Sequence, residues 1–156
     1  MEPYVIENGN ETDLDRIQPL WEKLNRLHQR VSPYFSHRFD AMTWERRKQS
    51  LLAKAQLICV SWVVDTKSKA IVGYCVGTIE KEDPNTGEID SIYIEEEYRG
   101  AGAGTQLVDN TIRWLKLHGA ETQKLLVGVG NEHVIDFYKH FGFYPLNVVL
   151  QRKEQG

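Results

Sequence analysis

Three glycines at alternate positions, Gly100, Gly102 and Gly104, follow Arg99 near the middle of the chain. Without a Cβ, glycine lets a ligand approach backbone amides closely. The glycines immediately precede a stretch with helical periodicity that ends at Gly119. Free N–H groups and the positive end of a helix dipole bind phosphate groups, and Arg99 can add a fixed positive charge. This spacing favours an anion site over the alternative, a tight connection with a solvated arginine.

Two familiar phosphate motifs do not fit this turn. A P-loop needs Gly-Lys-Ser/Thr at its end, whereas Gly104 is followed by Thr105 and Gln106. A dinucleotide fingerprint counted from Gly100 needs a glycine at its sixth position, where Thr105 stands. The phosphate ligand is therefore expected to be of another class.

Two carboxylates lie just upstream, in a predicted strand from Glu88 to Glu95. Glu88 and Asp90 alternate along it and so share one face. A primary amine has a pKa of about 10.4 and arrives protonated at neutral pH, so either carboxylate could accept its proton, directly or through water. The equally weighted alternative is that both are solvated residues at the start of the strand.

A second group of residues follows in a predicted helix, Glu132 to Phe141. Val134, Phe137, Tyr138 and Phe141 share one helical face. Tyr138 can be a core residue with a satisfied hydroxyl, or it can donate a hydrogen bond to a leaving group. Asn131, immediately before the helix, can cap it.

These two segments, YRGAGAG (98–104) and NEHVIDFYKHFGF (131–143), resemble the two signatures of the GNAT superfamily of N-acetyltransferases, and the resemblance covers residues 71 to 156. It implies acetyl-CoA as cosubstrate, with its pyrophosphate held by one run of residues. That run is Arg99, Gly100, Ala101, Gly102, Ala103, Gly104 and Thr105.

The resemblance also implies a mechanism of direct transfer through a ternary complex. Ile92, Tyr93 and Ile94 would pair with the pantetheine arm, and a backbone N–H near Ile94 would meet the oxyanion. Tyr138 would stabilise or protonate the leaving thiolate. Glu88, better placed than Asp90, would act as base, and Asn131 would contact the cofactor arm.

The acceptor side is predicted less sharply. The loop Val31 to Asp40 carries Tyr34 and Phe35, which either form a wall for the acceptor or pack two helices together. By the resemblance this loop closes over the acceptor, which favours the first interpretation. We expect Tyr34, Phe35 and Asp90 to contact a small-molecule or peptide amine.

The pattern of elements predicts one domain, 1–156, of the α+β class (α/β three-layer). By the resemblance it has the GNAT-like acyl-CoA N-acyltransferase fold, a mixed and mostly antiparallel sheet flanked by about four helices. We expect strands at 4–7, 57–65, 70–81, 88–95, 124–129 and 144–151. We expect helices at 13–28, with Leu24 on its buried face, at 41–54, with Trp44, Leu51 and Leu52 buried, at about 105–118 and at 132–141.

Composition narrows the function classes. A net charge of −3 gives no reason to expect nucleic acid or an anionic membrane as a partner. No apolar run approaches the roughly 20 residues that span a bilayer, so we expect a cytoplasmic protein. Cys59 and Cys75 are expected to be buried thiols, and the five histidines lack metal-ligand spacing, so no metal is predicted.

These observations predict an acetyl-CoA-dependent N-acetyltransferase, and the resemblance adds a homodimer. Two alternatives stay open. A non-catalytic acyl-CoA-binding module would keep the glycine turn without a working base and acid. A nucleotide-binding α/β domain would need an acidic ribose ligand after the next strand, and the one candidate, Glu121, precedes that strand.

Overall fold

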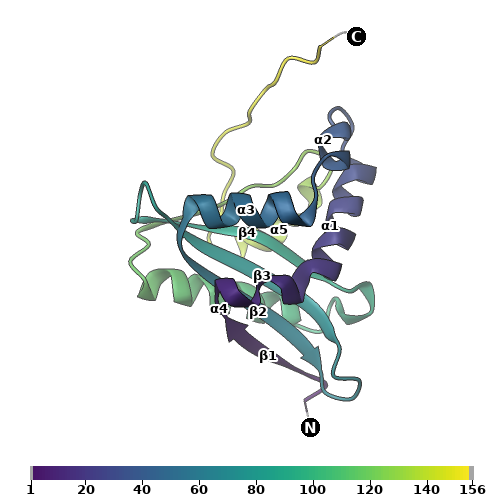
Figure 1. Ribbon diagram of the computed structural model, residues 1–156, viewed down its shortest axis with the longest axis vertical. Helices are drawn as coiled ribbons and strands as arrows, with labels where there is room; N and C mark the ends of the chain where they lie inside the picture. Colours follow the sequence, from purple (N-terminus) through teal and green to yellow (C-terminus); the bar gives the residue numbers. More distant parts are fainter. Residues whose placement is uncertain (1, 155–156) are drawn as a thin grey trace.

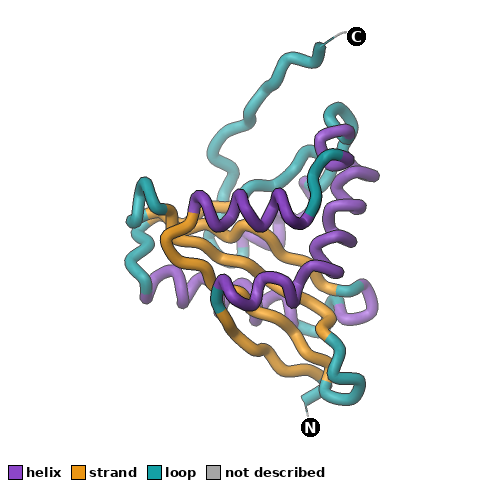
Figure 2. The backbone as a smooth tube through the Cα atoms, viewed as in Figure 1, coloured by secondary structure: helices purple, strands orange, loops and turns teal. Residues whose placement is uncertain are grey.

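A five-stranded sheet runs through the middle of the protein, as Figures 1 and 2 show for the computed structural model, which describes residues 2–154. Its strands lie in sequence order, antiparallel except for the parallel pair β4 and β5. Their bounds are β1 Tyr4–Gly9, β2 Ala55–Asp65, β3 Ile71–Glu80, β4 Thr86–Ile94 and β5 Thr122–Leu125. The predicted mixed, mostly antiparallel sheet is confirmed.

Helices cover both faces of the sheet, with α1 and α3 on one face and α4 and α5 on the other (Figure 1). The α-helices are α1 Gln18–Val31, α2 His37–Asp40, α3 Trp44–Lys54, α4 Ala103–Leu117 and α5 Ile135–Lys139. Three 3-10 segments join them, η1 Glu11–Ile17, η2 Glu96–Tyr98 and η3 Glu132–Val134. None of the helices within residues 2–154 is both long and apolar enough to cross a membrane.

The core on the α1 and α3 face is rich in aromatic side chains. The rings of Trp21 and Trp44 lie 5.5 Å apart, and Leu51 is buried beneath α3. Leu52, predicted to be buried, is 39% exposed, because it lies one residue past Leu51 and so points away from the sheet.

The opposite core, under α4 and α5, contains one of the two cysteines. Cys75 is fully buried and accepts a hydrogen bond from the Thr111 hydroxyl at 3.3 Å. Burial raises the pKa of the Cys75 thiol to about 12 and also raises the pKa of Cys59. Both cysteines are free thiols, as predicted, and both stay protonated near neutral pH.

The first helical region is longer than predicted and begins differently. The 3-10 segment η1 starts with a capping box. The Asn10 side chain accepts a hydrogen bond from a backbone N–H of the first turn, and the Asp13 side chain accepts one from the backbone N–H of Asn10. The helix α1 then begins at Gln18, with Pro19 in its first turn, and continues to Val31 rather than ending at His28.

The central strand β4 contains the irregularity on which the site depends. Val76 pairs with Ser91 and Gly77 with Ile89, so Asp90 is the extra residue of a β-bulge. On its other side β4 pairs with β5 only as far as Ile89, opposite Leu125. From Asp90 onward the two strands separate, and a cleft opens between them.

The last predicted strand, Tyr144 to Gln151, is wrong. Residues 144–154 form an extended arm that leaves the body of the protein (Figures 1 and 2). An isolated segment cannot form the ladder bonds that define a strand. The neighbouring strand is also shorter than the predicted 124–129, since β5 ends at Leu125.

Candidate active site

A pocket of about 80 Å³ lies where β4 and β5 separate, and we call it the cleft. It reaches from the α1 face of the sheet to the α5 face. Its walls come from four parts of the chain: α1, the second half of β4, the segment that follows β5, and η3 with α5. The lining residues are Leu24, His28, Ile89, Asp90, Ser91, Ile92, Leu125, Leu126, Val127, Gly128, Asn131, Val134 and Tyr138.

One wall of the cleft is the unpaired edge of β4. Ile92, Tyr93 and Ile94 pair with β3 on one side. On the β5 side, no strand in residues 2–154 pairs with them. A strand carries hydrogen-bonding groups toward both neighbours, so an extended ligand can add to this edge as a further strand. The β5-facing edge of β4 from Ile92 to Ile94 is therefore available to pair with a ligand.

The glycine turn leads from β4 into α4. Gly100 and Gly102 have φ values of +82° and +90°, a region that L side chains rarely adopt. Gly102 is the N-cap of α4 and supplies no side-chain cap, so the first N–H groups of the helix, from Ala103 on, keep their hydrogen-bonding capacity. The turn is held by β1, since the Tyr4 hydroxyl donates to the carbonyl of Ala101 at 3.1 Å.

Arg99 lies along the β4 edge. Its Nε donates to the carbonyl of Ile94 at 2.8 Å, and its guanidinium carbon lies 5.3 Å from the centre of the Tyr93 ring. Gly104, across the turn, would bring a Cβ to 3.3 Å from the Ile94 side chain. Arg99 and the start of α4 therefore both lie beside Ile94, at the end of β4.

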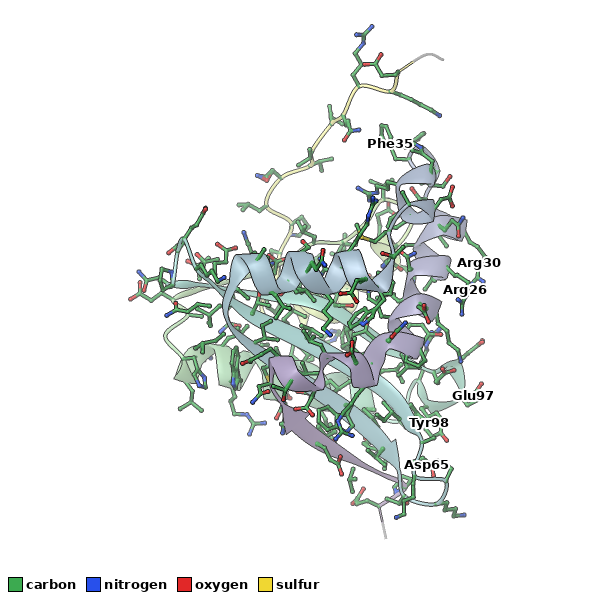
Figure 3. The ribbon with its side chains drawn as sticks, viewed as in Figure 1. Arg26, Arg30, Phe35, Asp65, Glu97 and Tyr98 are labelled. Atoms are coloured by element: carbon green, nitrogen blue, oxygen red, sulfur yellow. The ribbon has the colours of Figure 1, made fainter. Side chains whose placement is uncertain are left out.

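The segment between β4 and the glycine turn is anchored at two points. The Tyr98 hydroxyl donates to Asp65 Oδ2 at 2.5 Å, and both residues are labelled in Figure 3. That bond, with backbone donation from Ser68 and Lys67, lowers the pKa of Asp65 to about 2. At the other point, Glu95 pairs with Lys23 of α1 at 2.5 Å.

Tyr138 faces the cleft from α5. The residue is 8% exposed, and burial raises the pKa of its hydroxyl well above the ordinary value. No described side chain forms a hydrogen bond that shifts this pKa. The hydroxyl is also absent from the fully buried polar atoms that lack a partner among the described residues, so it is not sealed from solvent. It therefore retains contact with the cleft, as a neutral donor throughout the physiological pH range.

The two strand carboxylates share one face, as predicted, but a lysine ties them together. Lys54, the last residue of α3, donates to Glu88 Oε1 at 3.1 Å and to Asp90 Oδ1. Asp90 also accepts a hydrogen bond from Thr78 and lies 3.9 Å from Arg47. The Asp90 side chain is only 1% exposed, whereas that of Lys54 is 32% exposed, so the network runs from the interior to the surface.

The network keeps Lys54 protonated near neutral pH. Burial alone would lower the pKa of Lys54, but the charges of Asp90 and Glu88 and its hydrogen bonds to them raise it above the ordinary value. An amine that contacted Asp90 would have to compete with these partners. Of the two carboxylates, only Asp90 lines the cleft itself.

The loop before η3 closes the far end of the cleft. At Gly130, with φ of +102°, a Cβ would fall 2.1 Å from the carbonyl oxygen of Val31, so glycine alone allows this approach to the end of α1. Asn131 lines the cleft, and its side chain makes no capping bond to η3. Of the two predicted roles for Asn131, capping is not seen in the structure.

The aromatic loop lies beyond the cleft. Neither Tyr34 nor Phe35 lines it: Tyr34 is 62% exposed, and the Phe35 ring, labelled in Figure 3, lies 6.2 Å from that of His37 beside α2. Phe39 stacks on His28 at 5.6 Å. Their contact with an acceptor therefore stays a prediction.

Sequence reasoning missed one side chain in the α1 wall, His28. Burial, with a smaller contribution from Arg38, lowers its pKa, so it is neutral near pH 7. The sequence did carry a signal, because His28 follows Leu24 by four residues on the buried stripe of the helix. A polar residue on an apolar stripe marks a position where a helix can line a site.

Three comparisons place this geometry among known proteins. A protein of Methanocaldococcus jannaschii named an uncharacterized N-acetyltransferase is 38% identical over 153 residues, which are 94% of this chain and 63% of that protein. An N-alpha-acetyltransferase of Sulfurisphaera tokodaii is 29% identical over 157 residues, 94% of this chain and 83% of its own. The chain thus spans less than two thirds of the first of these relatives.

Solved structures share the fold. A proposed acetyl transferase from Pyrococcus furiosus has a TM-score of 0.76 at 19% identity, with 97% of this chain and 99% of that chain covered. An aminoglycoside N-acetyltransferase solved with CoA has a TM-score of 0.64 at 16% identity, covering 98% and 95%. The model of the acetyltransferase (GNAT) family matches residues 21–143. The chain belongs to the acetyltransferase (GNAT) family.

Proposed function

We propose that this protein is an acetyl-CoA-dependent N-acetyltransferase that transfers the acetyl group directly to a primary amine. One observation carries the proposal. The free edge of β4 runs from the bulge at Asp90 to Ile94, with the glycine turn at one end and the Tyr138 hydroxyl beside it. An edge of this kind suits a ligand with an extended amide-containing arm and a terminal pyrophosphate.

The residues of the turn fit the pyrophosphate. The first N–H groups of α4 are uncapped, and at Gly102 a Cβ would meet only the Tyr4 hydroxyl, at 3.7 Å. The space above the turn is therefore left to a ligand. Arg99 lies at the same place and can pair with phosphate oxygens by exchanging its bond to the Ile94 carbonyl. In this assignment residues 99–105 hold the phosphates and Ile92 to Ile94 hold the arm.

Bound acetyl-CoA supplies an activated acyl group and a thiol leaving group. The chain supplies hydrogen-bond donors and a proton acceptor around it. The Tyr138 hydroxyl, neutral and buried, would donate a hydrogen bond to the departing sulfur, and a backbone N–H near Ile94 would stabilise the oxyanion. Glu88 does not line the cleft, and its carboxylate is held by Lys54. It would therefore take the proton of the amine through a water and not by direct contact.

The acceptor is proposed as a small-molecule or peptide amine. Relatives support an amine acceptor in general terms, since one is named for aminoglycosides and another for the N-alpha position. In this chain an acceptor can enter from the α1 face, where Leu24 and His28 line the cleft beside Asp90. Neutral His28 can accept a hydrogen bond from the entering amine, and Asp90 contributes negative charge nearby.

Calorimetry and a kinetic assay together test the proposal. Titration with CoA and acetyl-CoA measures binding, with ATP and NAD as comparison ligands. Release of free thiol is then followed with a panel of amines: a polyamine, an aminoglycoside, an amino acid and a peptide with a free N-terminus. Turnover with any acceptor supports the enzyme. Tight binding without turnover across the panel would favour the non-catalytic acyl-CoA-binding module, and absence of binding contradicts both.

A further inference from the structure

On its α1 side, the cleft leads to a positively charged side chain through two stacked rings. The first ring is that of His28, which lines the cleft. The Phe39 ring stacks on it with the centroids 5.6 Å apart, and the guanidinium carbon of Arg38 lies 4.7 Å from the centre of the Phe39 ring. His28, Phe39 and Arg38 therefore form a continuous row from the cleft to a cation on α2.

Two hydrogen bonds hold α2 against α1, the helix that contributes this wall of the cleft. The Asn25 side chain donates to the carbonyl of Phe39 at 3.0 Å, and the Gln29 side chain donates to the carboxylate of Asp40. These bonds keep the row in place, because Asn25 and Gln29 lie on the same helix as His28.

Arg38 has no ion-pair partner within residues 2–154. Its side chain is exposed, and its acidic neighbour Asp40 bonds to α1 instead. Asp90, the one acidic residue in the described lining of the cleft, is paired with Lys54. The charge of Arg38 acts on the cleft, since it contributes, after burial, to the lowered pKa of His28. The α1 side of the cleft therefore carries a positive charge that an anionic group of a ligand can neutralise.

An arginine that contacts an aromatic ring uses the face of its guanidinium, which leaves the N–H donors at the edge of the group free. Those donors match the two oxygens of a carboxylate. We propose that Arg38 binds a carboxylate of the acceptor, so that the substrates are amines that carry a carboxylate in the same molecule. This inference rests on the function proposed above, in which the amine enters beside His28 and Asp90.

The spacing of the row sets how far the carboxylate lies from the amine. Since 5.6 Å separates the two rings and 4.7 Å separates the Phe39 ring from the guanidinium carbon, Arg38 lies at most the sum of the two, about 10 Å, from the His28 ring. An extended peptide spans up to about 3.3–3.6 Å per residue, so the amine and the terminal carboxylate of a dipeptide or tripeptide lie up to roughly 7–11 Å apart. A free α-amino acid carries both groups on one carbon. A short peptide with a free C-terminus therefore fits the row better than an α-amino acid.

The test measures how strongly the protein distinguishes a carboxylate from an amide. Triglycine and triglycine amide have the same N-terminal amine and differ only at the C-terminus. Calorimetry measures the affinity of both for the protein alone and for the protein saturated with CoA, and thiol release from acetyl-CoA is followed in parallel. The wild type is compared with Arg38→Gln, which removes the charge, with Arg38→Lys, which keeps it, and with Arg30→Gln as the matched control. Arg30 is exposed and lies two residues past His28, on a different side of α1 (Figure 3).

We expect the wild type to bind triglycine about five- to tenfold more tightly than its amide, a ratio between those of an exposed ion pair and of a hydrogen bond to a charged group. Arg38→Gln should abolish this preference, Arg38→Lys should keep part of it, and Arg30→Gln should leave it unchanged. The proposal is overturned by equal affinities in the wild type, by a preference that survives Arg38→Gln or is lost in Arg30→Gln, or by the absence of binding of both peptides. Preferential binding of triglycine without thiol release would support the carboxylate site and contradict only the acetyl transfer.

Discussion

Replacing Tyr138 by phenylalanine removes one hydroxyl from the cleft and nothing else from the core. The ring keeps its packing against Phe137, whose centroid lies 5.2 Å away, and the hydroxyl has no hydrogen bond to a described side chain that would be lost. We therefore expect the free energy of unfolding to change by less than about 1 kcal/mol, the value of a typical hydrogen bond.

The catalytic effect follows from the same environment. Burial makes the Tyr138 hydroxyl a weak acid, so it acts mainly as a hydrogen-bond donor to the negative charge that develops on sulfur. A hydrogen bond to a charged group is worth about 1.5–3 kcal/mol, which corresponds to a decrease in kcat of roughly 10- to 150-fold. The affinity for CoA should change by less than about twofold, since the charge is absent from the bound ground state.

The measurement is thiol release under saturating acetyl-CoA, with calorimetric titration of CoA and a thermal melt of each variant. Tyr144→Phe serves as a matched control, because Tyr144 lies on the exposed arm and not in the cleft. Full turnover by Tyr138→Phe would refute the assignment of the donor. A decrease in kcat accompanied by an equal loss of CoA affinity would assign Tyr138 to binding instead.

Three further predictions concern the turn and the charges. Gly102→Val should abolish CoA binding, measured by calorimetry, whereas Gly119→Val, with φ of +94° at a helix end away from the cleft, should cost similar stability but keep binding. Lys54→Met should lower the free energy of unfolding by about 2–3 kcal/mol, since it leaves the buried Asp90 carboxylate with only Thr78 and the more distant Arg47 as partners. Lys54→Met/Asp90→Asn should recover most of that loss in urea melts. The lowered pKa of Asp65 stabilises the fold above the unfolded value of about 3.9, and this gain is lost as pH falls toward about 2. The melting temperature of the wild type should therefore exceed that of Asp65→Asn at pH 5, and the difference should shrink as the pH is lowered to 2; a constant difference would contradict the argument.

Patterns within one element predicted much of the fold. Runs rich in β-branched and aromatic residues located β2 and β3, and the helical spacing of Leu14 to Leu24 located the first helix. Such patterns can be recognised because strand propensity belongs to the residues themselves and the helical period is fixed by backbone geometry. Boundaries were less accurate at the first helix, where the 3-10 segment and the extension to Val31 depend on contacts with the sheet.

The sequence alone is sufficient to predict the glycine turn before α4, since Gly100 and Gly102 adopt a positive φ that glycine permits without strain. It also determined that Glu88 and Asp90 share a face. Three features could be seen only in the folded chain: Lys54 joins these two carboxylates, β4 bulges at Asp90 and separates from β5, and the arm leaves the body. Those features depend on which distant segments pair and in what register, and this is set by the sum of long-range contacts, not by any local run of residues.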